Sequence, residues 1–96
     1  MGDGRAKRKK NKTLRVRHKH FRNRVFKLLA GVGPMTHTEI WNAFFDGHPL
    51  ARQRTGEKWS QRTLPHKGTI PVILRRDGRF AEDRDTQTWW VKEELL

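Results

Sequence analysis

The sequence reads T-I-P-V-I-L-R-R-D-G-R from Thr69 to Arg79, and this stretch carries both a start and a stop signal for a short helix. The Thr69 hydroxyl can cap the first free amides, and Pro71 falls in the first turn, where a missing N–H costs little. The Asp-Gly pair near the end of the stretch marks a turn after the last apolar residue. We therefore predict a helix over residues 70–76.

The predicted helix has one apolar side and a basic C-terminal end. Ile70, Ile73 and Leu74 share one side by their spacing, which predicts that this side faces a core. Arg75 and Arg76 project from the last turn. Such arginines can contact phosphate, but they also complement the helix dipole, so a purely structural role is the alternative.

Composition limits the chain to one small basic domain with a tail. It has 96 residues, one third of them apolar, which predicts a single modest core. Zero cysteines exclude disulfides and cysteine-bound zinc. Because the sequence has neither an apolar run of membrane-spanning length nor a secretory leader, we predict an intracellular protein, in the cytoplasm or nucleoid, or in the nucleus of a eukaryote.

Positive charge is concentrated at the N-terminus. The net charge is +12, and the first 24 residues hold eleven Lys or Arg against one acid, Asp3. Residues 1–12 include R-A-K-R-K-K-N-K and should be disordered when free, since they repel one another and bury nothing. We interpret them as a basic arm that lies on a phosphate backbone; a solvated tail is the alternative. An anionic membrane fits less well, because no apolar face accompanies the charge.

The segment 13–30 is the best helix candidate. Its apolar residues follow helical spacing, Thr13 is a candidate cap, and the Gly-Val-Gly-Pro stretch after Ala30 should end it. Basic residues, among them Arg15 and Arg17, occupy the other faces. His18 and His20 point to different sides of a helix, so no metal site is predicted.

A second helix should follow a very short strand at Met35. Thr36 and Glu39 have capping-box spacing, and the apolar run after them predicts a helix that ends near Asp46-Gly47. Its aromatic residues are most simply core. The alternative is that they stack on nucleic-acid bases.

Residues 48–67 read as a long basic loop with about one turn of helix near 59–64. Arg52, Arg54 and Arg62 lie in it and would be free to contact a partner, while Trp59 and Leu64 should hold it to the core. A loop of this length in a small domain is usually functional or disordered.

The sequence pattern of the C-terminal part predicts a β-hairpin. Its strands should cover residues 79–82 and 86–91, with Phe80 and one of Trp89 and Trp90 pointing inward. Arg84 would lie at the tip of the hairpin, between two aspartates that would resist close approach to phosphate.

The order helix, brief strand, helix, loop, helix and hairpin is that of a winged helix, and it predicts an α+β domain over residues 13–96. The run from Lys67 to Asp77, the aromatic residue Phe80 and the closing Trp90-Val91 resemble the third helix and wing of HARE-HTH-type winged-helix domains. That resemblance implies association with DNA-linked and transcription-associated proteins. The chain departs from the family pattern in its long basic loop and its arginine-rich arm.

Double-stranded DNA binding with a transcriptional or genome-organising role is the function we predict. The alternative is an interaction module on RNA polymerase or the ribosome that uses its tail on RNA. In either case Lys67, Thr69 and Arg62 should approach bases more readily than Arg76, because the N-terminal residues of a recognition helix usually read bases. The candidate nucleic-acid contacts are Arg5, Lys7, Arg8, Lys9, Lys10, Lys12, Arg15, Arg17, Arg52, Arg54, Arg62, Lys67, Thr69, Arg75, Arg76 and Arg84.

An enzyme is not predicted, and neither is a cofactor. The sequence contains no phosphate-binding glycine loop and no histidine–cysteine metal cluster. Carboxylates such as Asp77 and Glu82 would need to pair around a metal to serve a nuclease-like reaction. Carboxylates near a turn are far more often exposed polar residues.

Overall fold

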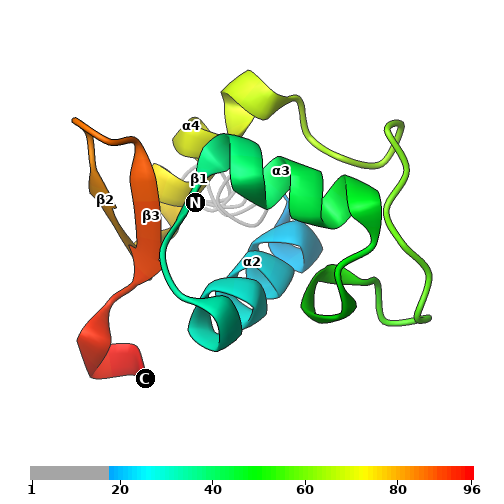
Figure 1. Cartoon of the computed structure of the whole chain (residues 1–96), viewed down its shortest axis with the longest axis horizontal. Coiled ribbons are helices and arrows are strands. Elements are labelled where there is room, and N and C mark those ends of the chain that lie inside the picture. Colours follow the sequence, from blue (N-terminus) through cyan, green and yellow to red (C-terminus); the bar gives the residue numbers. More distant parts are fainter. Residues whose placement is uncertain (1–17) are drawn as a thin grey trace, which may run out of the picture.

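Three helices pack around a small antiparallel sheet in residues 18–96, the part of the chain that the computed structural model describes (Figure 1). The α+β class predicted from the sequence is confirmed for this part. The predicted arm, at residues 1–12, and the first turns of the predicted helix 13–30 lie outside the described residues. The elements are α2 (Lys19–Val32), β1 (Met35–Thr36), α3 (His37–Asp46), α4 (Ile70–Asp77), β2 (Phe80–Asp83) and β3 (Thr88–Val91).

Helix α2 places one apolar stripe in the core. Phe21, Val25 and Leu28 on this stripe are at most 2% exposed. The helix continues two residues beyond the predicted end and stops at Gly33, whose φ of 107° lies in a region that glycine adopts readily. No helix within residues 18–96 has the length and apolar character needed to cross a bilayer.

Helix α3 begins at the predicted capping box. The backbone N–H of Glu39 donates to the Thr36 hydroxyl, and the backbone N–H of Thr36 donates to the Glu39 carboxylate. The helix ends at Gly47, which is left-handed as the predicted Asp-Gly stop requires. Ile40 and Phe44 are fully buried. The prediction that all the aromatic residues of this helix are core is wrong, because Phe45 is exposed.

The sheet has the strand order β1-β3-β2, with β3 in the centre. Met35 pairs with Trp89, and Phe80 pairs with Val91. The predicted short strand and hairpin are confirmed, although the hairpin strands start one or two residues later than expected. Trp89 is the inward tryptophan, at 2% exposure.

The long loop between α3 and α4 is held to the core by two side chains, as predicted. Trp59 and Leu64 are 5% and 8% exposed. The predicted turn of helix near 59–64 is a single hydrogen-bonded turn, in which the Leu64 N–H donates to the Ser60 carbonyl over 3.0 Å. The loop's short 3-10 helix lies earlier, at Pro49–Ala51.

Helix α4 forms over the predicted stretch but begins differently. Its apolar residues Ile70, Ile73 and Leu74 are buried, and Pro71 lies in the first turn. The predicted Thr69 cap is wrong: Thr69 has helical dihedral angles, and its side chain makes no capping hydrogen bond. The chain instead enters through a 3-10 turn, Lys67–Thr69, and the imidazole of the preceding histidine, His66, accepts from the Gly68 N–H.

Candidate nucleic-acid interface

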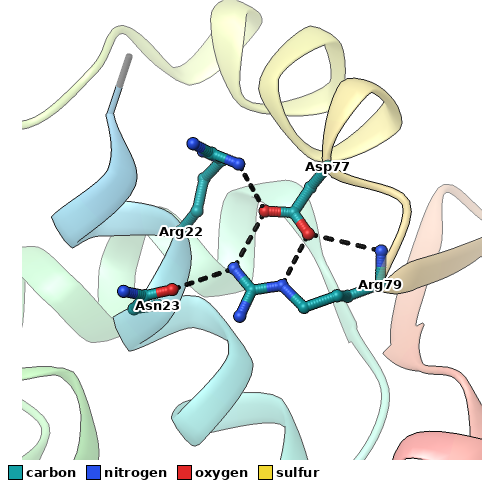
Figure 2. A network of polar contacts seen from close by, with 4 residues as sticks. All are labelled: Arg22, Asn23, Asp77 and Arg79. Atoms are coloured by element: carbon teal, nitrogen blue, oxygen red, sulfur yellow. Dashed lines mark hydrogen bonds and ion pairs between the residues drawn. The ribbon is translucent and has the colours of Figure 1, made fainter. Parts of the chain in front are cut away.

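A buried carboxylate fixes the C-terminal end of α4 against α2 (Figure 2). Asp77 accepts from Arg22 at 2.8 Å and from Arg79 at 2.6 and 2.9 Å. The side chain of Asp77 is 2% exposed. Arg79 also donates to the Asn23 amide oxygen at 3.0 Å, so the network ties the turn after α4 to the first two turns of α2. We name these four residues the Asp77 clamp.

The electrostatics of the clamp favour the charged carboxylate. Burial would raise the pKa of Asp77, but the hydrogen bonds from Arg79 and Arg22 outweigh it and hold that pKa below its usual range. The hydrogen bond between Arg79 and Asp77 also raises the pKa of Arg79. Since a negative charge at a helix C-terminus opposes the helix dipole, the two arginines also offset an unfavourable position. Two cations are thereby committed to structure.

Two of the predicted phosphate contacts share a second carboxylate. Glu82 on β2 accepts from Arg75 at 2.7 Å and from Arg84 at 3.1 Å. The bond from Arg75 lowers the pKa of Glu82 and raises the pKa of Arg75. The guanidinium of Arg75 also lies 5.8 Å from the ring centroid of Trp89. A nucleic acid would therefore compete with Glu82 for both arginines.

The outer face of α4 has no such acidic partner in the part of the chain that the structure describes. Thr69, Val72 and Arg76 are exposed along it, and Val72 is an apolar residue at 45% exposure. Within residues 18–96, Arg76 makes no ion pair. Lys67, in the 3-10 turn before the helix, is exposed as well. This face therefore offers two cations, a hydroxyl and a methyl-bearing side chain.

A hollow of about 460 Å³ adjoins the N-terminal edge of this helix. Trp41 of α3 lies on one side, and the ammonium of Lys67 lies 4.8 Å from its ring centroid. Gln61 and His66 add polar groups. Sequence reasoning favoured the core for the aromatic residues of α3 and kept base stacking as the alternative, but it did not predict that Lys67 would lie over Trp41. Trp41 is partly buried and packs against the core, while it also lines the hollow.

A second hollow, of about 570 Å³, lies beside the first turns of α2. It brings Arg54 of the long loop together with Lys19 and Arg24 of the helix. His20, which also lines it, lies against Trp59 with ring centroids 5.4 Å apart. The loop thus places one predicted contact beside the positive face of a helix.

The other predicted contacts do not form one cluster. Arg62 is exposed on the loop, and Arg52 donates to the carbonyl of Gly56 at 3.0 Å, which makes it part of the loop's own structure. Arg5, Lys7, Arg8, Lys9, Lys10, Lys12, Arg15 and Arg17 lie outside the described residues. The candidate interface of the described part is therefore Lys67, Thr69, Val72 and Arg76, with Arg62 and Arg54 on the loop.

The chain matches no protein-family model, and comparisons with curated proteins and with solved structures give no match. The resemblance to HARE-HTH-type domains therefore stays a prediction. Among residues 18–96 no group of three His, Asp or Glu side chains is arranged to hold a metal ion.

Proposed function

We propose that this chain is a winged-helix protein that binds double-stranded DNA. The observation that carries the proposal is the exposed outer face of α4, formed by Thr69, Val72 and Arg76 and preceded by Lys67, which makes no ion pair within residues 18–96. The topology supports it, because helix, strand, helix, helix and hairpin follow in winged-helix order and β1 completes the sheet of the hairpin. In this assignment α4 is the recognition helix and the β2–β3 hairpin is the wing.

A recognition helix reads DNA because the major groove admits an α-helix and presents a different donor and acceptor pattern for each base pair. Its N-terminal residues usually reach the base edges. Lys67 and Thr69 would occupy that position here. The exposed methyl groups of Val72 suit the methyl group of thymine, and Arg76, further along the helix, suits a phosphate.

Cations outside α4 would supply the part of the affinity that does not depend on sequence. Arg54, Lys19 and Arg24 line one hollow on the described surface. The predicted arm would add further phosphate contacts. Since each neutralised phosphate releases counterions, binding should weaken with salt at a log–log slope of about −0.9 per contact. A transcriptional or genome-organising role is the function that such binding would serve.

A selection from a pool of random duplexes, followed by titration of the selected and of random DNA, tests this function. Lys67→Ala should weaken the selected duplex about five- to tenfold more than random DNA, as loss of a base contact requires. Lys27→Ala, which removes the same charge from an exposed position on α2, is the matched control and should affect both duplexes equally. Equal effects of the two variants, or no duplex binding at low salt, would contradict the proposal.

A further inference from the structure

Helix α3 presents two stacked aromatic rings at the surface. Trp41 and Phe45 lie one turn apart, with ring centroids 5.0 Å apart and planes inclined by only 12°. Phe45 is 40% exposed. Ile40 and Phe44, immediately before each of them, are fully buried and fix the helix on the core. The two rings therefore form a platform on a helix that is fixed to the core before any ligand binds. We name it the Trp41–Phe45 platform.

A lysine accompanies each ring of the platform. The ammonium of Lys67 lies 4.8 Å from the centroid of Trp41, and that of Lys58 lies 6.0 Å from the centroid of Phe45. Both lysines are exposed and come from segments outside α3. Flat rings with a cation beside each one match the chemistry of a nucleotide, which joins a flat base to a phosphate.

We propose that the Trp41–Phe45 platform binds unpaired bases of single-stranded nucleic acid. A base would stack on a ring, and the lysine beside it would move to the adjoining phosphate. The exchange is favourable because an exposed lysine–ring contact is worth a factor of about two to five in affinity. Stacking of one base on an aromatic side chain is worth a factor of about five to 150.

The hollow beside the platform supports this ligand over an apolar protein partner. Trp41, Gln61, His66 and Lys67 line it together with Leu64 and Pro65, and within residues 18–96 no carboxylate lines it. Its volume of about 460 Å³ accommodates a group of nucleotide size, and Gln61 and His66 can donate to or accept from a base edge. An apolar helix or strand bound in this hollow would leave Lys67 without a counter-charge.

This site is distinct from the proposed duplex interface. In a duplex the faces of the bases are stacked on one another, whereas the platform requires a free base face. Lys67 belongs to both surfaces, but Trp41 and Phe45 do not lie on α4. The test therefore leaves Lys67 unchanged, so that the two functions can succeed or fail separately.

Titration of the full chain with two single strands of equal length, oligothymidylate and the same backbone without bases, tests the platform. The two strands carry the same charge, so the basic arm and surface cations contribute equally to both. The wild-type chain should bind oligothymidylate at least fivefold more tightly than the abasic strand. Phe45→Leu, which keeps an apolar side chain but removes the ring, should reduce that preference to less than twofold.

Two further variants make the result decisive. Trp41→Leu should also abolish the preference, with the fold checked by circular dichroism. Val32→Ala, at an equally exposed apolar residue on α2, should keep it. Equal affinity of the wild-type chain for both strands would overturn the inference, and so would a preference that survives Phe45→Leu and Trp41→Leu. If the wild-type chain binds no duplex DNA but still prefers oligothymidylate to the abasic strand, the proposed duplex binding is wrong and the platform proposal stands.

Discussion

The two ends of α4 use positive charge in opposite ways. At the C-terminal end, Asp77 holds Arg22 and Arg79, and Glu82 holds Arg75, so three of the four arginines there are committed to internal bonds. The fourth, Arg76, is exposed. At the N-terminal end, Lys67 lies over an aromatic ring rather than beside an acid. The comparison shows that a count of basic residues overstates the number of contacts available to a phosphate.

The difference fits the proposed function. If α4 is a recognition helix, its C-terminal end has to be fixed in angle, because a helix that pivots cannot hold its N-terminal residues over a chosen base. The clamp achieves this with a buried carboxylate, which binds its partners far more firmly than exposed ion pairs do. In the same proposal the N-terminal end exchanges partners on binding, which the weak contact between Lys67 and Trp41 permits.

Asp77→Asn should disrupt the Asp77 clamp and cause the largest loss of stability among the substitutions proposed. The variant removes the charge that two arginines bind, and it should lower the free energy of unfolding by about 3 kcal/mol. Urea denaturation followed by circular dichroism measures this. Asp83→Asn, at an exposed residue of the hairpin, is the matched control and should leave stability within about 0.5 kcal/mol. Similar losses in the two variants would contradict the structural role of the clamp.

Local signals in the sequence predicted most of the fold. The capping box at Thr36, the glycine stops and the apolar spacing of α4 are each encoded within a few residues, and all three appear in the structure. The start of α4 was mispredicted because a 3-10 turn capped by His66 competes with a threonine cap.

The candidate site was harder to predict, because its chemistry depends on residues far apart in the chain. Arg22 and Asp77 are 55 positions apart, and no local pattern shows that they bind each other. The sequence marked Asp77 as a turn residue and predicted an exposed carboxylate, which is wrong, because its side chain is 2% exposed. The arrangement of Trp41, Phe45, Lys58 and Lys67 likewise requires the long loop to fold back along α3.

Arg79→Ala and Arg76→Ala separate the structural from the exposed arginines. Arg79 supports Asp77 and Asn23, so its loss should lower the free energy of unfolding by about 2 kcal/mol. Arg76, exposed on the outer face of α4, should change stability by less than about 0.5 kcal/mol and instead weaken duplex DNA binding. Thermal unfolding and DNA titration of both variants provide the check. A stability loss of the same size for Arg76→Ala would remove the distinction between the clamped and the exposed arginines.

Acidification should lower the stability of the wild-type chain through the Asp77 clamp. The pKa of Asp77 is lower in the folded chain than in the unfolded chain. Between these two pKa values the unfolded chain binds more protons than the folded chain, so the free energy of unfolding falls as the pH falls. The stabilisation is complete above about pH 4 to 5 and is lost as the pH falls through the folded-state pKa. Unfolding free energies measured from pH 6 downward should therefore fall more steeply for the wild-type chain than for Asp77→Asn. Parallel pH profiles would contradict this assignment.

Glu82→Gln should have the smallest effect of these substitutions on stability. It should make the cations near the C-terminal end of α4 available for binding, as Lys67 is at the N-terminal end. Its partners Arg75 and Arg84 are both exposed, and exposed ion pairs contribute little to stability, so the fold should be unaffected. Removing the carboxylate charge frees both guanidinium groups for phosphate. If the duplex passes the hairpin as proposed, its log–log salt slope should steepen by about one unit, the value expected for one added phosphate contact. An unchanged slope would place the duplex away from β2 and from these two arginines.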